Sequence, residues 1–278
     1  IDFIEEKEQE REKLKFSPFE FGIFSILDVH LKEENKNKLR EFVGEIVNMI
    51  KPDIIGFSCL EANYLDCLEK AKWVKKLFPH IITIFGGVYP TLRPEIIKED
   101  AIDYVCVGEG EIPMLDLCKS LSGESEIPPH KIPGFHTKYK GEILKNPLSR
   151  VVENLDDIPY FPRDEVSPYY GIYVGRGCPY SCAFCSWAGV RKATNNHKVR
   201  FRSIDNILGE IENMYSIYGN AFGETIKFQD DTFMMNTGWA EEFLGRFHKT
   251  FPKLQFFCCL RANMINEKVV KLLSENGC

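Results

Sequence analysis

The sequence predicts an α/β protein with a doubly wound parallel sheet in its first half and a second region that resumes the same alternation of strands and helices. Short, near-continuous apolar runs of strand length alternate with stretches whose apolar residues recur at the spacing of one helix face. Such runs are typical of strands that are buried on both faces of a parallel sheet. With 278 residues the chain exceeds the usual size of one domain, so we expect two domains.

The first half of the chain holds the doubly wound sheet, which we assign to residues 19–145 after a charged lead-in at residues 1–18. Apolar stretches on either side of Gly141 also predict a small hairpin. The predicted strands are residues 21–27, 53–58, 81–85, 104–107, 134–138 and 142–145, and the predicted helices are residues 35–50, 64–78, 96–99 and 112–121.

A linker is predicted over residues 146–168, because residues 154–168 hold three prolines and four acidic residues. Three strand and helix units are predicted in the region 169–278 that follows. Their strands are residues 171–174, 225–229 and 254–258, and their helices are residues 203–218, 238–251 and 267–276.

Composition narrows the class of protein. A hydrophobic content of 44% is ample for buried cores, and 41 acidic against 35 basic residues argue against nucleic acid binding over the whole surface. No apolar run approaches the roughly 20 residues of a membrane span. Residues 1–15 are highly charged and do not look like a signal peptide, so we expect a cytoplasmic protein. The chain lacks a starting Met and stops just after a predicted helix, so both ends are expected to be cuts.

Small residues follow the predicted strands of the first half. Ser58 ends one strand, Gly86 and Gly87 follow the next, and Gly108 and Gly110 follow the third. Parallel sheets bind ligands beyond the carboxyl ends of their strands, and glycine lets a backbone approach a bulky ligand closely. Each glycine taken singly also fits a simple turn of the chain.

Three cysteines, Cys178, Cys182 and Cys185, stand at the spacing C-x3-C-x2-C on a loop that follows a predicted strand. Three thiolates on one loop suit a soft metal site. A structural zinc site that adds His197 or a remote cysteine is the alternative, although the paired C-x2-C knuckles of such sites are missing. Disulfides are disfavoured in a reducing compartment. The other seven cysteines lie mostly among apolar neighbours and are expected to be buried thiols without chemistry: Cys59, Cys67, Cys106, Cys118, Cys258, Cys259 and Cys278.

The cysteine motif, with Phe184 just before its last cysteine, resembles the signature of the radical S-adenosylmethionine (radical SAM) enzymes. The phrases DIIGFSC, FGGVYPTLRPEII and DYVCVGEGE are similar to the cobalamin-binding domain that precedes the radical SAM domain in one branch of that family. The resemblance implies a Rossmann-like, cobalamin-binding sheet followed by the first half of a partial (β/α)6 barrel. Three of its six units are present before Cys278, so the radical SAM domain is expected to be incomplete.

The resemblance also implies a set of binding residues. The three cysteines would hold a 4Fe-4S cluster and leave one iron open. The segment after Gly87 departs from the family, which often has His where Tyr89 stands, and the motif D-x-H-x-x-G is absent, so no histidine is expected below the cobalt of cobalamin. Phe184, Asp230, Asp231 and Arg261 would bind S-adenosylmethionine, and Ser58, Gly86, Gly87, Tyr89, Gly108 and Gly110 would bind cobalamin.

Several of these residues also have plain structural interpretations. Asp231 fits a helix cap or a turn, and Arg261 fits a surface ion pair as well as a cofactor contact. A basic cluster follows the cysteines and is expected to be a solvated loop, with an anionic substrate or partner as the alternative. That cluster is Arg191, Lys192, Lys198, Arg200 and Arg202.

The function implied by the resemblance is reductive cleavage of S-adenosylmethionine by the cluster, followed by cobalamin-dependent methylation of an unreactive carbon. Radical rearrangement or cyclisation without methyl transfer is the second hypothesis, and a non-catalytic cobalamin-binding or cluster-binding module is the third. The partners implied are a small, natural-product-like substrate and an electron donor such as flavodoxin or ferredoxin. Motifs of hydrolases and of phosphoryl transfer are absent from the sequence.

Overall fold

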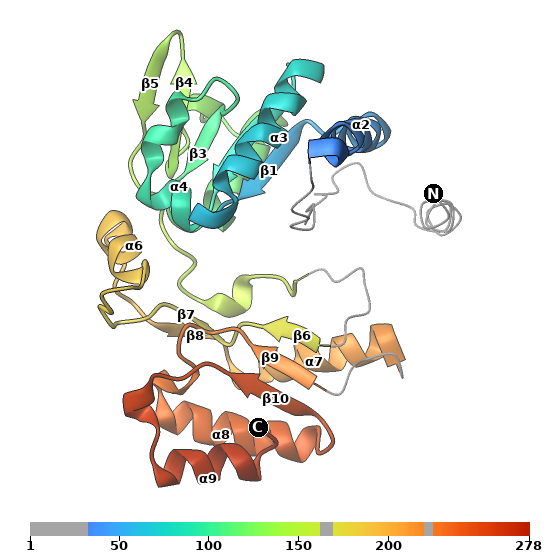
Figure 1. Ribbon diagram of the computed structural model, residues 1–278. Coiled ribbons are helices and arrows are strands. Elements are labelled where there is room, and N and C mark those ends of the chain that lie inside the picture. The colour runs from blue at the N-terminus through green and yellow to red at the C-terminus, as the bar shows by residue number, and fades with distance from the viewer. Residues whose placement is uncertain (1–32, 162–168, 220–224) are drawn as a thin grey trace.

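A computed structural model describes residues 33–161, 169–219 and 225–278 (Figure 1). The predicted lead-in, the predicted strand at residues 21–27 and the end of the predicted linker lie outside these residues. Within the described residues, no helix is both long enough and apolar enough to cross a membrane.

The first half is built on a five-stranded sheet with the order β1-β2-β3-β4-β5. The first three strands are parallel, β4 pairs antiparallel with β3, and β5 pairs antiparallel with β4. The strands are β1 (Ile54–Ser58), β2 (Ile82–Gly86), β3 (Tyr104–Cys106), β4 (Phe135–Tyr139) and β5 (Glu142–Lys145). The predicted hairpin therefore exists, and it extends the sheet of the first half.

Helices cover both faces of this sheet, as a doubly wound arrangement requires. Along β2, Phe85 packs into the cluster that contains Leu68 and Ala71 of α3, whereas its neighbour Ile84 packs into the cluster that contains Leu117 of α5. Adjacent strand residues thus face opposite helices, which explains why the strand reads as a continuous apolar run. The helices of this half are α2 (Glu33–Ile50), α3 (Tyr64–Leu77), α4 (Val88–Leu92) and α5 (Glu111–Leu121).

The second half contains a three-stranded parallel sheet with the order β10-β9-β6, and a separate antiparallel pair, β7 and β8. The strands are β6 (Tyr169–Ile172), β7 (Gly175–Arg176), β8 (Arg200–Phe201), β9 (Thr225–Phe228) and β10 (Gln255–Cys258). The helices are α6 (Trp187–Thr194), α7 (Ile204–Tyr218), α8 (Thr237–Thr250) and α9 (Glu267–Glu275). The predicted alternation of strands and helices is confirmed, while closure into a partial barrel stays a prediction.

Short 3-10 helices complete the fold. They are Glu61–Asn63, Pro94–Lys98, Pro129–Lys131, Leu155–Asp157, Phe233–Met235 and Ala262–Met264.

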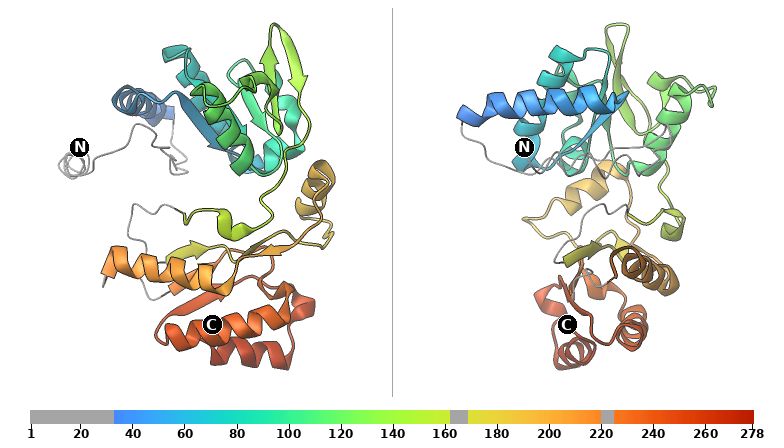
Figure 2. Two further views of the ribbon diagram at one scale, coloured as in Figure 1. Left: turned by 180° about the vertical axis from the view of Figure 1, so that it is seen from behind. Right: turned by 90° about the vertical axis from the view of Figure 1, so that its right-hand side faces the viewer.

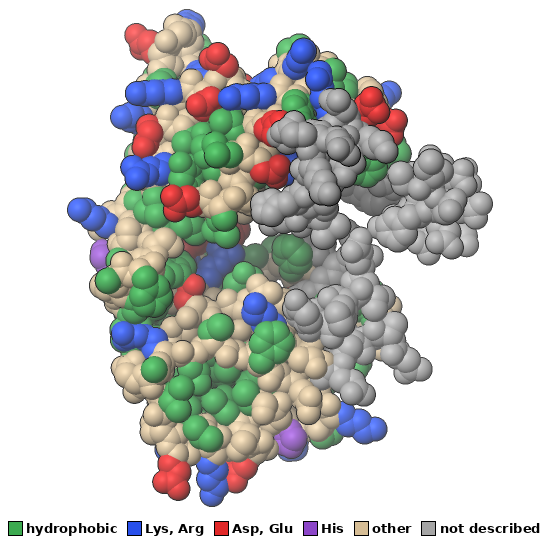
Figure 3. All heavy atoms as spheres, in the orientation of Figure 1, with side chains coloured by type: hydrophobic (Ala, Val, Ile, Leu, Met, Phe, Trp, Pro, Cys, Tyr) green, Lys and Arg blue, Asp and Glu red, His purple; other side chains and the backbone are tan. Residues whose placement is uncertain are grey.

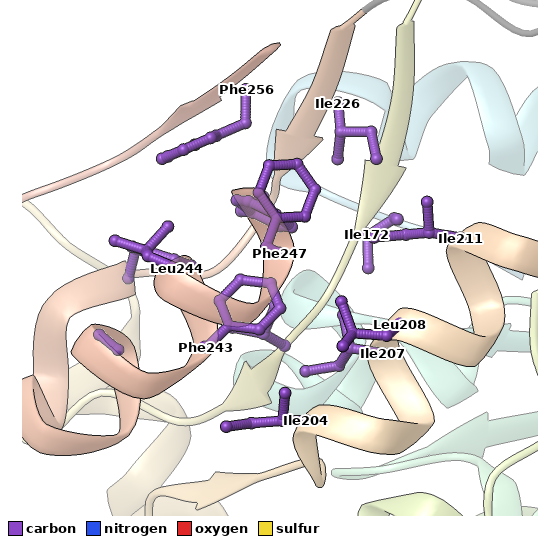
Figure 4. Close-up of a cluster of buried hydrophobic side chains, with 14 of the residues drawn as sticks. Ile172, Ile204, Ile207, Leu208, Ile211, Ile226, Phe243, Leu244, Phe247 and Phe256 are labelled. Carbon is purple, nitrogen blue, oxygen red and sulfur yellow. The ribbon is translucent and has the colours of Figure 1, made fainter. Parts of the chain in front are cut away.

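An aromatic core joins the helices of the second half to its sheet (Figure 4). Phe228 of β9 stacks on Phe233 at 5.1 Å and meets Phe243 and Phe247 of α8 edge-on at 5.3 and 5.7 Å. Phe256 of β10 lies 5.1 Å from Phe228. Large buried aromatic side chains dominate core energetics, so this cluster fixes β9 and β10 relative to α8.

The two halves lie one above the other, with α6 reaching from the second half beside the first (Figures 1 and 2). The main contact between them is that of α6 with α4. An alanine Cβ at Gly189 of α6 would lie 3.0 Å from Leu92 Cδ2 of α4, so the two helices approach closely. The carboxyl ends of β1 to β3 consequently face the region that carries the cysteine loop.

Candidate functional site

The cysteine loop begins directly after β7. Gly177 has a φ of 101°, and a Cβ there would lie 2.5 Å from the Lys198 carbonyl oxygen, so only glycine fits this turn. Cys178 is buried and lies 3.9 Å from the Thr232 hydroxyl, measured from Sγ to Oγ1. Cys182 and Cys185 are partly exposed, and all three thiols are free.

Two arginines from distant parts of the chain hold the segment between the first two cysteines. Arg191 of α6 donates to the carbonyl oxygens of Pro179 and Tyr180 and to Oγ of Ser181, the last at 2.7 Å. The guanidinium of Arg261 lies 3.9 Å from the centre of the Tyr180 ring, which is a cation–π contact. Arg261 thus contacts the cysteine loop, and its contact with a cofactor stays a prediction.

The three cysteines suit an iron–sulfur cluster by the chemistry of their donor atoms, since they are unpaired thiols on one short loop. Among the described residues, no three His, Cys, Asp or Glu side chains stand close enough together to hold one metal ion. His197, the extra ligand of the zinc alternative, is exposed.

The two aspartates after β9 have different surroundings. Asp230 is buried, and its carboxylate accepts hydrogen bonds from the amides of Val174 and Gly175 at 3.2 and 2.6 Å. Burial raises the pKa of Asp230 to about 6, although both amides favour the charged form. Asp231 is exposed and is hydrogen-bonded by the side chain of Trp187. Asp230 thus ties β9 to the strand that leads into the cysteine loop, and Asp231 contacts α6.

Phe184 is 93% exposed and lies between two of the cysteines in the sequence. Single exposed apolar side chains are common, so this exposure leaves the ring free to contact a ligand but does not identify one.

Four predicted cobalamin residues lie at or shortly after the ends of β1, β2 and β3: Ser58, Gly86, Gly87 and Gly108. Ser58 pairs with Gly86 at the ends of β1 and β2, and Gly87 follows with a φ of 101°. A Cβ at Gly87 would lie 2.9 Å from the Cys59 carbonyl oxygen, so this glycine is required by backbone packing. Gly108, which has a φ of 95°, lies so close to α6 that a Cβ there would be 3.2 Å from Thr194 Cγ2.

Tyr89 and Gly110, the other two predicted cobalamin residues, each contact a neighbour within the first half. The Tyr89 ring lies 4.6 Å from that of Tyr64 and packs on the core beside α3. Gly110 precedes α5, where a Cβ would lie 3.9 Å from the Cys106 sulfur. Tyr89 therefore has a structural role in the described chain, whereas Gly110 has room for a side chain at ordinary contact distance.

A cleft of about 190 Å³ joins the two predicted cofactor regions. Gly87 and Gly108 line it from the first half, and Cys178 and Trp187 line it from the second. Figure 3 shows the hollow between the two halves, with basic side chains deep inside it. Pockets for drug-sized ligands measure about 300–1,000 Å³, so the cleft holds only part of a ligand as large as cobalamin.

The prediction that the basic cluster is a solvated loop is wrong for most of its members. Arg191 and Lys192 lie on helix α6, and Arg200 lies on β8 with its side chain 7% exposed. The Arg202 guanidinium lies 2.5 Å from the buried carboxylate of Glu210. For Arg200 the charge pattern was misleading because its partner Glu109 is 91 positions away and leaves no local signal. Lys192 and Lys198 are exposed as expected.

Two carboxylates of the first half pair with arginines of the second half, and these ion pairs were not predicted from the sequence. Glu109 accepts hydrogen bonds from Arg200 and Arg176, and Glu111 binds Arg176 at 2.5 Å. Burial alone would raise the pKa of Glu111, but the hydrogen bond and charge of Arg176 hold that pKa below its usual value. The only sequence signal was an acidic residue between Gly108 and Gly110.

The prediction that the cysteines outside the loop are buried holds for Cys59, Cys67 and Cys106. It is wrong for Cys259 and Cys278, which are exposed, and Cys118 and Cys258 are only partly buried. Burial raises the pKa of the Cys106 thiol to about 12 and that of the Cys258 thiol to about 12. The pKa of Cys59 is also raised, by a hydrogen bond with Cys67 and by burial. Thiols of this kind are protonated and unreactive at neutral pH.

Comparison with known proteins agrees with this arrangement. Residues 24–117 match the B12 binding domain family. An uncharacterized methyltransferase of Pyrococcus horikoshii, PH0819, is 28% identical over 247 residues, which cover 85% of this chain and 52% of that protein. The cobalamin-dependent radical SAM methyltransferase TokK of Streptomyces tokunonensis is 27% identical over 52% of this chain and 24% of its own length. The anaerobic magnesium-protoporphyrin IX monomethyl ester cyclase of Rubrivivax gelatinosus is 29% identical over 66% of this chain and 35% of its own length.

The fold is similar to that of TsrM from Kitasatospora setae, a radical S-adenosylmethionine methyltransferase solved with tryptophan and an analogue of S-adenosylmethionine. That match has a TM-score of 0.70 at 14% identity and covers 88% of this chain and 50% of TsrM. This chain therefore spans about half the length of its first relatives. It carries a B12-binding domain and is homologous to the cobalamin-dependent radical SAM enzymes.

Proposed function

We propose that the protein is a radical SAM enzyme, acting as a cobalamin-dependent methyltransferase on an unreactive carbon of a small molecule. The observation that carries this proposal is the shared cleft. Gly87 and Gly108 of the B12-binding domain line it together with Cys178 of the cysteine loop. A methyl group held on one side and a substrate radical formed on the other would need such an adjacency.

In this proposal Cys178, Cys182 and Cys185 bind a 4Fe-4S cluster. The open iron of such a cluster, when bound, would supply the electron that cleaves S-adenosylmethionine, and cobalamin would supply the methyl group. The glycines at the ends of β2 and β3 let the corrin ring approach the sheet closely. The Arg191 and Arg261 contacts would keep the cysteine loop in place while the cluster is assembled.

S-adenosylmethionine would lie over the exposed face of the cysteine loop. Phe184, with 93% of its surface exposed, offers a ring for stacking, and Arg261 brings a positive charge next to Tyr180. Asp231 is exposed beside Trp187 and is the better of the two aspartates for an amino group. Asp230 already accepts two amide hydrogen bonds, so we assign it to holding the site together.

The proposal includes an external electron donor such as flavodoxin or ferredoxin, and a cytoplasmic location. Free thiols and an oxygen-sensitive cluster both favour a reducing compartment.

Anaerobic reconstitution tests the cofactor assignment. We expect the protein, incubated with iron and sulfide, to hold about four irons per chain. Changing Cys178, Cys182 or Cys185 to Ala should abolish iron retention, whereas Cys259→Ala, which changes an exposed cysteine outside the loop, should not. Zinc bound in place of iron, or equal loss of iron in the Cys259 variant, would overturn the assignment.

Product analysis separates the reaction classes. Reconstituted protein is given S-adenosylmethionine, hydroxocobalamin and a one-electron reductant, and the products are measured by mass spectrometry. Methyl transfer yields S-adenosylhomocysteine from the methyl donor, and reductive cleavage yields 5′-deoxyadenosine. We expect both products from a methyltransferase.

Cyclisation without methyl transfer is the second candidate, because the Rubrivivax gelatinosus relative is named as a cyclase. That outcome would give 5′-deoxyadenosine without S-adenosylhomocysteine. Neither product from protein with a full cluster would favour a module that binds cofactors without catalysis.

A further inference from the structure

A network of ion pairs joins the turn after β3 to the strand pair β7 and β8. Glu109 accepts from Nη2 and Nη1 of Arg200, the latter at 3.2 Å, and from Nη1 of Arg176 at 3.5 Å. Glu111 accepts from Nη2 of Arg176 at 2.5 Å. Arg200 also donates to the carbonyl oxygen of Val152. One residue of the B12-binding domain thus contacts both arginines of the strand pair.

This network is partly buried. The side chains of Arg200 and Glu109 are 7% and 22% exposed, whereas those of Lys198 and Glu153, which pair the second half with the linker, are 62% and 64% exposed. Desolvation largely cancels the attraction of a buried ion pair, so such a pair is a weak source of stability. A bidentate arginine pair instead fixes geometry, because the planar guanidinium fork matches the carboxylate.

The register of β7 and β8 places two arginines opposite each other, so this strand pair requires a nearby carboxylate such as that of Glu109. Arg176 and Arg200 are direct partners in this antiparallel pair, and the pair is only two residues long. Like charges opposite each other destabilise a strand pair. The carboxylates that offset this repulsion, Glu109 and Glu111, come from the other half of the molecule. The strand pair is therefore charge-balanced only when it is docked on the B12-binding domain.

Both ends of the network attach to predicted cofactor-binding segments. Glu109 lies between Gly108 and Gly110 after β3. Arg176 ends β7, and Gly177 and Cys178 follow it immediately. A shift of Glu109 therefore moves the start of the cysteine loop.

We propose that Glu109 is a positioning residue that locks the start of the cysteine loop to the glycine turn of the B12-binding domain and makes the cluster respond to ligand binding at that turn. This inference rests on the proposed function for the identity of the two ligands. Its geometric part, the locking of β7 and β8 by Glu109, stands on the ion pairs alone.

Hydrogen–deuterium exchange of the whole chain without cofactors tests the geometric part. We expect Glu109→Gln to speed exchange of the amides at residues 174–177 and 200–202 by about tenfold, because it leaves Arg200 buried without its partner. Glu109→Asp, which keeps the charge, should restore part of the protection. Glu153→Gln is the control, since it removes an exposed pair between the linker and the second half.

The double variant Glu109→Gln with Arg200→Gln separates positioning from general misfolding. It removes the buried cation and the repulsion between the two arginines, and it leaves the pair of Arg176 and Glu111 intact. We expect exchange at residues 174–177 to be slower than in Glu109→Gln alone. Exchange in Glu109→Gln equal to that of the unmodified protein, or no recovery in the double variant, would overturn the proposal.

A spectroscopic measurement tests the coupling. In the reconstituted protein and in Glu153→Gln, we expect hydroxocobalamin to change the electron paramagnetic resonance spectrum of the reduced cluster, and in Glu109→Gln this change should be lost. A spectral response that persists in Glu109→Gln would overturn the coupling. If the unmodified protein binds no hydroxocobalamin, the proposed function fails and the coupling with it, while the exchange experiment still decides whether Glu109 locks the strand pair.

Discussion

At the scale of single residues, Asp230 illustrates how a buried carboxylate can serve structure beside a functional loop. Its two oxygens accept the amides of Val174 and Gly175, so β9 is fastened to the segment that precedes Cys178. The position of the aspartate pair at this strand end could be predicted from the sequence and its family resemblance. Which carboxylate is buried could not be predicted, because burial depends on the packing of β6 against β9.

The pKa of Asp230 leads to a pH prediction. The folded value of about 6 lies above the ordinary value of 3.8, so the folded protein binds the proton more tightly than the unfolded chain does. This carboxyl therefore lowers the free energy of unfolding as pH rises from about 4 to 6, by an amount on the order of 2 to 3 kcal/mol. Asp230→Asn should remove this decline.

Urea unfolding followed by tryptophan fluorescence at several pH values measures the effect. The lost hydrogen bond of Asp230→Asn adds an offset of about 1 kcal/mol that is independent of pH. The change in the slope of the free energy of unfolding against pH can thus be separated from this constant offset. Asp205→Asn, which changes an exposed carboxylate in the same half, should leave the pH dependence of the free energy of unfolding unchanged. Parallel pH profiles for Asp230→Asn and the unmodified protein would contradict the assignment.

Arg191 gives a second prediction at this scale. Arg191→Lys keeps the charge but cannot reach Pro179, Tyr180 and Ser181 together, because lysine lacks the guanidinium fork. We expect the reconstituted variant to lose iron to a chelator about tenfold faster, which corresponds to about 1.4 kcal/mol of loop stabilisation. Lys192→Ala, a change at the exposed neighbour on the same helix, is the control and should release iron at the original rate.

At the scale of elements, the buried strands were predictable and two short helices were not. Strands β1, β2, β9 and β10 lie within one residue of their predicted bounds, because continuous apolar runs of strand length are a strong signal. Helix α4 was missed because it starts after Gly87 and contains Pro90, both of which usually interrupt helices. Helix α6 was missed because it is only 8 residues long and contains Gly189, so its apolar pattern is too short to stand out.

The turn into α4 gives a prediction about backbone packing. Gly87→Ala places a Cβ at a left-handed residue and 2.9 Å from a backbone oxygen of Cys59. We expect a loss of about 2 to 4 kcal/mol in the free energy of unfolding. Gly123→Ala shares the positive φ but has open space around it, so about 1 kcal/mol is expected there.

Chemical denaturation of the two alanine variants separates backbone strain from steric overlap. Gly56→Ala adds a third reference, since Gly56 lies in β1 with no atom within 4 Å of a Cβ. Equal losses for Gly87→Ala and Gly123→Ala would mean that the approach of Gly87 to Cys59 is relieved at no cost.

At the scale of the whole molecule, the order of the two halves was predictable and their contacts were not. The linker and the cysteine loop are local signals, and the family resemblance supplied the domain order. The pairing of Glu109 with Arg200 joins residues 91 positions apart, and nothing in the local sequence of either residue indicates the other. The same holds for Arg261 and Tyr180, which follow different strands, β10 and β7, and meet across the site.

The contact of α4 with α6 gives the last prediction. Gly189→Leu inserts a side chain where even a Cβ would lie 3.0 Å from Leu92, whereas Gly245→Leu in α8 enters open space. Both changes raise helix propensity by about 1 kcal/mol, so neither should unfold its own helix. Small-angle X-ray scattering should show a larger radius of gyration for Gly189→Leu alone, because the two halves are pushed apart at their main contact. Val88 and Thr91 of α4 and Val190 and Thr194 of α6 line the cleft, so the same variant should also bind hydroxocobalamin with altered affinity. Identical scattering from the two leucine variants would mean that Leu92 rotates away and that the cleft does not depend on this helix contact.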